Sequence, residues 1–216
     1  MDNAHHYFNT GIHFQKIKAV MRRIAFFDFD GTITTKDSFL QFIKYSKGRL
    51  AFYTGFLLYS PFLVAYKLKI ISNQLAKELV IRHFFGKMPQ QKFQQLCDAF
   101  SSGVIPSIVR PKALIEIQKH QQAGTEVVIV SASAENWLRK WCEEMGVKCI
   151  ATRLHMADEN ISGKLEGFNC YGNEKVARIH QLYDLNNYNE IYCYGDTKGD
   201  KPMLELATIC FFKPFR

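Results

Sequence analysis

Four groups of polar residues have the types and the spacing that phosphate chemistry requires. In chain order they are Asp28-Phe29-Asp30-Gly31-Thr32, then Ser131, then Lys175, and then Asp196 with Asp200. A carboxylate can attack phosphorus and form a covalent phospho-enzyme, and carboxylate oxygens are ligands that Mg²⁺ prefers. A hydroxyl and an ammonium group can bind phosphate oxygens. Each residue alone could be a turn or capping residue, but the ordered set indicates a site for phosphoryl transfer.

The first and second groups each need a particular backbone. Alternate residues of an extended strand point to opposite faces, so Asp28 and Asp30 can share a site only if the chain turns at Phe29–Asp30, which Gly31 permits. We expect Ser131 and the amides that follow it, beginning with Ala132, to bind phosphate at the N-terminus of a helix. Ser133 would cap that helix.

Short apolar runs that alternate with helical patterns predict the elements that position these groups. Strands are expected at Ile24–Phe29, Glu126–Val130, Lys148–Ala151, Glu190–Tyr194 and Ile209–Phe212. Helices are expected after Pro111 and Ser133 and over Glu174–Tyr183 and Lys201–Ala207, and Asp158–Gly167 is expected to be a β-hairpin flap. This alternation indicates an α/β fold, a doubly wound parallel sheet covered on both faces. The carboxyl ends of its strands share one edge, where the four groups would meet.

The segment from Thr35 to Arg110 interrupts this alternation. It contains no convincing strand but has helical patterns over Asp37–Tyr45, from Ser72 to His83 and from Pro89 onwards. We therefore expect an inserted all-helical cap over residues 36–110. Residues 21–35 and 111–216 would form the α/β core, and residues 1–20 a loose N-terminal extension with a short helix near Phe14–Met21.

The positive charge of the chain belongs to the cap. The net charge is +8, and the segment from Lys36 to Arg110 has 11 basic and 3 acidic residues, which accounts for all of it. Leu50–Tyr66 is a run of 17 residues without charge, bounded by Arg49 and Lys67. One interpretation is a buried cap helix or helical hairpin. The other is an interfacial segment, anchored by basic residues and tyrosines, that contacts an anionic membrane surface.

Several classes of protein are excluded or disfavoured. A hydrophobic content of 47% with 22% charged residues excludes general disorder. The chain has no signal peptide pattern and no charge-free stretch of membrane-spanning length. Its six cysteines form no CxxC pair, which favours free buried thiols in a reducing compartment over disulfides or a zinc site. No pattern of a nucleic-acid-binding module is present. We expect a cytoplasmic protein, with peripheral contact at the inner membrane surface as a hypothesis.

The four groups lie in motifs that resemble those of the haloacid dehalogenase-like phosphohydrolases. The motifs are FDFDGT, VIVSAS, GNEKV and YGDTKGDKPML, and the resemblance extends from Ile24 to about Phe212. The helical insertion between the first two motifs resembles the phosphoserine-phosphatase-like branch. The resemblance implies a core of the family's Rossmann-like type, Mg²⁺ as cofactor, and an aspartyl-phosphate intermediate.

The resemblance also implies a role for each motif residue. Asp28 would be the nucleophile and a metal ligand. Asp30 would be the general acid and base and would bind the metal through its carbonyl group. Asp196 would be a further metal ligand, and Asp200 would orient the metal site or Lys175. Phosphate would be bound by the remaining residues of the set, namely Thr32, which also supports the loop, with Ser131, Ala132 and Lys175.

The cap bears on the substrate. Phosphoserine-specific relatives recognise the amino acid through a glutamate and an arginine of the cap. Asp37 stands at the first position and Leu79 at the second, with Arg82 nearby, and Gly199 replaces an asparagine of the last motif. We therefore expect a substrate other than phosphoserine, recognised by Asp37 and Arg82. A weaker resemblance links the order Asp37, Phe39, Phe42, Tyr45 and then an apolar stretch to the cap of phosphatidylglycerophosphatase C.

Three hypotheses for function follow. The first is a Mg²⁺-dependent phosphatase acting on a small phosphorylated metabolite or a lipid head group. The second is a phosphatidylglycerophosphatase-like enzyme at the membrane surface. The third is a membrane- or partner-binding protein whose phosphatase site is vestigial. The sequence gives no indication of oligomeric state.

Overall fold

A computed structural model describes residues 21–216, so the extension and the short helix predicted for residues 1–20 lie outside the described residues. One six-stranded sheet forms the core, in the order β4-β3-β2-β1-β5-β6. The strands are β1 Arg23–Phe27, β2 Glu126–Ala134, β3 Lys148–Ala157, β4 Asn160–Glu166, β5 Glu190–Gly195 and β6 Ile209–Phe212. All neighbouring pairs are parallel except β3 with β4, which are antiparallel.

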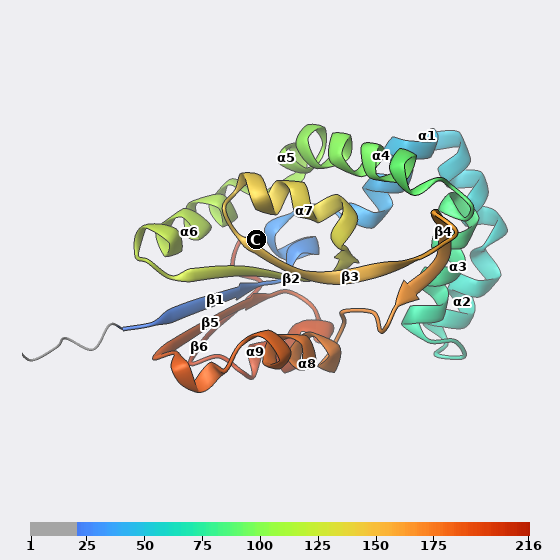
Figure 1. Cartoon of the computed structure of the whole chain (residues 1–216). Helices are drawn as coiled ribbons and strands as arrows, with labels where there is room; N and C mark the ends of the chain where they lie inside the picture. The colour runs from blue at the N-terminus through green and yellow to red at the C-terminus, as the bar shows by residue number, and fades with distance from the viewer. Residues whose placement is uncertain (1–20) are drawn as a thin grey trace, which may run out of the picture.

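Alternate residues of β1 face two separate hydrophobic cores. Ala25 and Phe27 belong to the core under α6 (Pro111–Gln122) and α7 (Glu135–Glu144). Ile24 and Phe26 belong to the core under α8 (Asn173–Leu182) and α9 (Lys201–Leu204). The two helix pairs therefore cover opposite faces of the sheet, as Figure 1 shows. The predicted doubly wound α/β fold is confirmed, because helices cover both faces of the sheet and bury β1 from Ile24 to Phe27.

Some predicted boundaries were wrong. β1 ends at Phe27, two residues early, because the chain turns at Phe29–Ile33. The hairpin exists, but its first strand is the extended β3, and Asp158 and Glu159 form its turn with positive φ angles of 48° and 61°. The edge strand β6 is exposed and not covered on both faces. Two short 3₁₀ turns, Leu185–Asn187 and Lys198–Asp200, precede β5 and α9.

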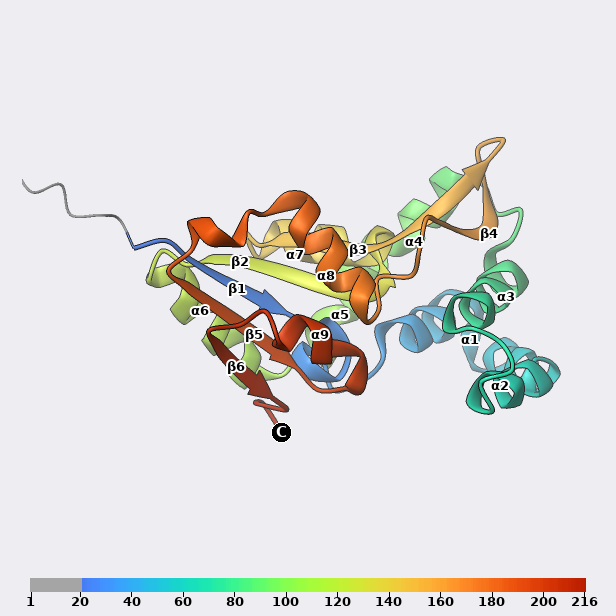
Figure 2. The same cartoon turned by 90° about the horizontal axis from the view of Figure 1, so that it is seen from below.

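Five helices lie between β1 and α6. They are α1 Ser38–Leu58, α2 Ser60–Lys67, α3 Asn73–Phe85, α4 Gln90–Gly103 and α5 Ile105–Ile108. In Figure 2, α1 to α3 project beyond the carboxyl end of β1, with α2 at the far end. The segments that connect this insertion to the core are hydrogen-bonded together, Thr35 N to Ile108 O at 2.8 Å and Arg110 N to Ile33 O at 2.8 Å. These contacts support our proposal that residues 36–110 form the cap.

An aromatic cluster joins the cap to the core. The ring of Phe42 in α1 stacks on Phe85 of α3 and on Trp137 of the core helix α7, with centroid distances of 5.2 and 5.0 Å. Phe93 and Phe100 of α4 meet the same ring edge-on. Since Phe42 is fully buried, this cluster fixes α1 against the core helix α7.

The uncharged run Leu50–Tyr66 forms the second half of α1 and most of α2, which a bend at Tyr59 joins; this bent pair of helices is called the α1–α2 hairpin. Only part of it is buried: Phe52 and Gly55 face inward, whereas α2 has no buried residue. Between residues 21 and 216, none of the helices combines the length and the apolar character needed to cross a bilayer.

The six cysteines are free thiols. Four of them are buried, Cys149 is half-buried and Cys210 is exposed. The prediction of free thiols therefore agrees with the structure, except that Cys210 lies on the exposed edge strand β6.

Candidate active site

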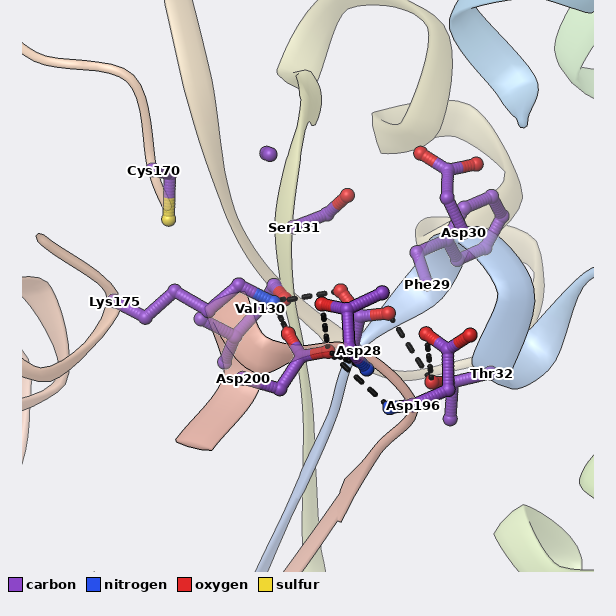
Figure 3. Close-up of polar contacts among 12 residues, drawn as sticks. Asp28, Phe29, Asp30, Thr32, Val130, Ser131, Cys170, Lys175, Asp196 and Asp200 are labelled. Carbon is purple, nitrogen blue, oxygen red and sulfur yellow. Dashed lines mark hydrogen bonds and ion pairs between the residues drawn. The ribbon is translucent and has the colours of Figure 1, made fainter. Parts of the chain in front are cut away.

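Three carboxylates gather at the carboxyl ends of β1 and β5. Asp28 follows β1 directly, and its N–H donates to Tyr194 O of β5 at 2.9 Å. Asp196 follows β5, and Asp200 ends the 3₁₀ turn beyond it. One oxygen from each of the three carboxylates lies within 4.8 Å of the others, and all three residues are buried. Figure 3 shows the group.

The turn after β1 gives the first motif its shape. Gly31 has a φ of +86°, and a Cβ atom there would lie 2.6 Å from Asp196 Oδ2, so only glycine fits. Thr32 Oγ1 donates to Asp28 Oδ2 at 3.1 Å and to Asp196 Oδ1 at 3.3 Å. The turn therefore brings the Thr32 hydroxyl between the two carboxylates.

Lys175 provides the positive charge beside this cluster. Its Nζ, at the start of α8, donates to Asp28 Oδ1 at 2.6 Å, to Asp200 Oδ1 at 2.7 Å and to Val130 O at 2.8 Å. Burial alone lowers the pKa of Lys175, but the charges of Asp28 and Asp200 outweigh burial and hold this pKa above its ordinary value. Lys175 therefore stays protonated although its side chain is buried.

Asp200 lines the cavity and also holds the loop that follows β5. Its Oδ2 accepts from Thr197 N at 2.9 Å, from Thr197 Oγ1 at 2.8 Å and from Asp196 N at 3.2 Å. Burial raises the pKa of Asp200, but Lys175 and these hydrogen bonds outweigh it and hold the pKa below its usual value. Asp200 therefore links Lys175 to the backbone that carries Asp196.

The two carboxylates of the first motif have raised pKa values. Burial raises the pKa of Asp28 to about 6, against the opposing charge of Lys175. Burial, and then the charge of Asp37, raise the pKa of Asp30 to about 7. Asp30 accepts from Ser38 N at 2.6 Å and from Ser133 Oγ at 2.5 Å. A carboxyl group with this pKa can both donate and accept a proton near neutral pH.

Two expectations about the second motif were wrong. Helix α7 begins at Glu135 with Ala134 at its N-cap, so Ser131 does not lie at the N-terminus of that helix. Ser133 does not cap the helix, because its hydroxyl binds Asp30. Ser131 Oγ instead accepts from Ser133 N at 3.0 Å.

A cavity of about 230 Å³ lies between the core and the cap over these residues. Core residues in its lining are Asp28, Asp30, Ser131, Ala132, Ser133, Tyr171, Lys175, Thr197 and Asp200, and cap residues are Asp37, Phe39, Asn73 and Lys77. The structure thus brings Asp37 to the cavity but not Arg82, which is exposed and packs against Gly163 of the hairpin.

Sequence reasoning missed Lys77, the cap cation of this cavity. Its Nζ donates to Ala132 O at 2.7 Å and to Asn169 Oδ1 at 2.8 Å, so it connects α3 to the core. Burial lowers the pKa of Lys77 to about 8. The available signal was the spacing of Asn73 and Lys77, four residues apart on one helical face.

Tyr171 is the second residue that the sequence analysis missed. A Cβ atom on Gly199 would lie 2.1 Å from the ring of Tyr171, so the glycine provides the space for this ring beside the cavity. The replacement of the branch's asparagine by Gly199 is thereby connected to an aromatic wall of the site.

The acid cluster fits a divalent cation. Its donors are hard carboxylate oxygens, which suit Mg²⁺. Lys175 contacts two of the three carboxylates, Asp28 and Asp200. Arg216 also pairs its guanidinium group with Asp196 Oδ2, so a cationic group already lies against this carboxylate. The residues present are therefore compatible with a magnesium site.

The fold and this site define a capped α/β enzyme with an acidic centre at the carboxyl edge of its sheet. The chain belongs to the haloacid dehalogenase-like hydrolase family, whose sequence profile matches residues 25–205. Among curated proteins, the protein CicA of Caulobacter vibrioides is 34% identical over 193 residues, covering 88% of this chain and 85% of that protein. A probable phosphatase of Mycobacterium tuberculosis is 28% identical, covering 85% of this chain and 66% of that protein.

Solved structures share the fold. A Bordetella pertussis protein of unknown function superposes with a TM-score of 0.78 at 24% identity, covering 88% of this chain and 89% of that one. A phosphoserine phosphatase, solved as an analogue of its phospho-aspartyl intermediate, gives a TM-score of 0.63 at 16% identity, covering 88% and 85%. The predicted family is confirmed by the profile match, and the phosphoserine phosphatase shares the fold of this chain.

Proposed function

We propose that this phosphatase of the haloacid dehalogenase-like family hydrolyses a phosphomonoester through an aspartyl-phosphate on Asp28. The observation that carries the proposal is that Asp28 and Lys175, in contact with each other, line one cavity, while Asp196 lies beside Asp28 in the same group of carboxylates. A phosphate dianion requires a nucleophile, a cation and hydrogen-bond donors in one place. Ser131 and Lys175 supply a hydroxyl and an ammonium group beside the Asp28 carboxylate.

The proposed reaction has two steps. A carboxylate oxygen of Asp28 forms a bond to phosphorus while the bond to the leaving oxygen breaks, and the Asp30 carboxyl group gives that oxygen its proton. Water then attacks the phosphorus, Asp30 takes a proton from the water, and the bond to Asp28 breaks to release phosphate. Asp30 suits both roles because its pKa is raised to about 7 and Ser133 and Ser38 hold its carboxylate.

Mg²⁺ is the proposed cofactor, held by Asp28, Asp196 and the carbonyl group of Asp30. Bound there, it would neutralise the carboxylates and the transferring phosphoryl group. We expect chelation of divalent cations to abolish turnover of p-nitrophenyl phosphate. We also expect added Mg²⁺ to raise the Tm of the wild-type protein, because a ligand that binds only the folded state stabilises it.

Asp196→Asn tests this assignment independently of turnover. The variant should lose the Tm increase with Mg²⁺, whereas Asp158→Asn, in the exposed hairpin turn, should keep it. An undiminished Mg²⁺-dependent Tm increase in Asp196→Asn would remove Asp196 from the metal site.

The cap side of the cavity supports a small polar leaving group as the substrate class, either a phosphorylated metabolite or a lipid head group. Polar side chains of the cap, namely Asp37, Asn73 and Lys77, line this cavity of about 230 Å³. The ammonium group of Lys77 has three donors, of which two bind Ala132 and Asn169. We propose that the third binds the substrate.

Lys77→Met is expected to raise the KM about 10- to 100-fold, as the loss of one charged hydrogen bond predicts, with a smaller effect on kcat. Steady-state kinetics with the best substrate from a screen of phosphorylated sugars, amino acids and lysolipids would measure both. Lys92→Met, an exposed lysine of the same cap, is the matched control. A fall in kcat at constant KM would contradict a substrate-binding role.

Among the other hypotheses, one observation favours a lipid phosphatase at the membrane surface, namely the exposed apolar hairpin of the cap. The vestigial-site hypothesis predicts that the wild-type protein does not turn over any phosphomonoester with Mg²⁺. Cytoplasmic location and the absence of nucleic-acid binding stay predictions from the sequence.

A further inference from the structure

The outer face of the α1–α2 hairpin carries apolar side chains that no other part of the described chain covers. Six of these residues have exposed fractions between 54% and 80%. These six residues, which lie on α1, on α2 and in the segment directly after α2, are called the hairpin face: Leu50, Leu57, Leu58, Val64, Leu68 and Ile70. Single exposed apolar residues are common, whereas a group on neighbouring elements marks an interaction surface.

The hairpin face belongs to an ordered part of the cap. On its inner side, Phe52 packs against Phe56 with a centroid distance of 4.5 Å, and Phe56 meets Phe84 of α3. A Cβ atom on Gly55 would lie 2.4 Å from Phe84, so α1 and α3 are in close contact there. The hairpin is therefore fixed to the cap on one side, and its apolar outer side needs another partner.

The charge of the residues around the hairpin face indicates which kind of partner it binds. No acidic residue occurs between Asp37 and Glu78. Arg49 is next to Leu50 in the chain, and Lys67 and Lys69 are on either side of Leu68. All three are exposed, and none of them forms an ion pair within residues 21–216. An apolar face bordered by unpaired cations complements an anionic lipid surface. A second copy of the chain would instead bring like charges together across a twofold axis.

We infer that the hairpin face docks the protein on an anionic lipid bilayer. Its apolar side chains enter the boundary between head groups and acyl chains, and its cations lie among the lipid phosphates. Tyr53 and Tyr66 are exposed on the same hairpin and suit that boundary.

The docked face adjoins the catalytic cavity. Asn73 lines that cavity, and its Nδ2 donates to Tyr66 Oη at 2.9 Å. Asn169 Nδ2 in turn donates to Asn73 Oδ1. If the proposed function holds, docking places the cavity beside phosphorylated lipid head groups; the docking itself does not depend on that function.

Sedimentation with vesicles tests the inference. The wild-type chain should sediment with phosphatidylcholine vesicles that contain phosphatidylglycerol, less so at high salt, and should stay in solution with phosphatidylcholine alone. Leu57→Asp/Leu58→Asp should lower the partition coefficient about tenfold or more. Lys67→Gln/Lys69→Gln should weaken binding and its salt dependence. Leu182→Asp, on the core helix α8 with the same 66% exposure as Leu58, should bind as the wild type does.

The outcomes separate docking from catalysis. Leu57→Asp/Leu58→Asp should keep the wild-type Tm and the wild-type turnover of a soluble phosphate ester, because both residues are exposed and outside the cavity lining. Absence of vesicle binding by the wild type at low salt would overturn the inference and leave the phosphatase proposal intact. Equal binding by this double variant, or a dimer that only the double variant disrupts, would also overturn it.

Discussion

Asp28→Asn is expected to lower kcat/KM for a phosphomonoester by about 10⁴-fold or more, because loss of a nucleophile removes the covalent route itself. An amide has the shape of the carboxylate but cannot form the acyl phosphate. The fold should not be lost. The raised pKa of Asp28 means that burying its charge opposes folding, so the neutral residue should keep or increase the Tm.

The measurement combines steady-state kinetics with thermal unfolding of the same samples. Asp158→Asn makes the same chemical change in the exposed hairpin turn and should keep full activity. Undiminished activity in Asp28→Asn would refute the assigned nucleophile. A large fall in Tm would instead show that the Asp28 carboxylate stabilises the fold.

Lys175→Met is expected to reduce both stability and activity. The variant leaves Asp28 and Asp200 buried without their common cation, and breaking a buried ion pair in this way costs about 3–5 kcal/mol. It also removes a charged donor beside the phosphate, for which we expect a further loss of about 10³-fold in kcat. Urea unfolding measures the first effect, and kinetics on the folded fraction measures the second.

A double variant keeps this prediction testable if Lys175→Met folds poorly. Lys175→Met/Asp200→Asn removes one of the two stranded charges, so it should recover part of the free energy of unfolding but none of the activity. Lys112→Met, an exposed lysine of α6, is the control for a surface change. If the double variant is no more stable than the single one, charge is not the reason for the loss.

Local signals in the sequence were sufficient for several elements. Ser72 was expected to cap a helix, and its side chain accepts from Leu75 N, three residues away. The expected apolar face of α7 is buried, including Trp137 and Trp141. In both cases the partners are close along the chain or share one helical period, so one short segment contains the information.

The same kind of signal failed for Ser133. It has the residue type of a helix cap and lies close to a helix, yet its hydroxyl donates to Asp30, 103 residues away. Lys77 was missed for a related reason. In the sequence, Lys77 resembles an ordinary surface lysine of a helix. Only the packing of the cap on the core brings its ammonium group to Ala132 and Asn169.

The uncharged run of the cap left two interpretations open because composition does not say which side of a helix is covered. Some residues of this run are buried and others are exposed. Phe52 is 8% exposed and Leu57 is 76% exposed, although both are apolar and belong to α1. Phe84 packs against one side of α1 and leaves the other side exposed, so lipid contact of the exposed side stays a prediction.

By itself, the sequence determined the fold class, the family and the residue types at the carboxyl edge of the sheet. Runs of apolar residues specify buried parallel strands, and such strands end at one edge. Only the tertiary structure decided which groups touch. Lys175 and Asp28 are 147 residues apart in the sequence, yet Lys175 Nζ lies 2.6 Å from Asp28 Oδ1. The cap contributes Lys77 and Asp37 to the same cavity from a separate segment. Contacts at such separation depend on how whole layers pack, and no local pattern of residues encodes that.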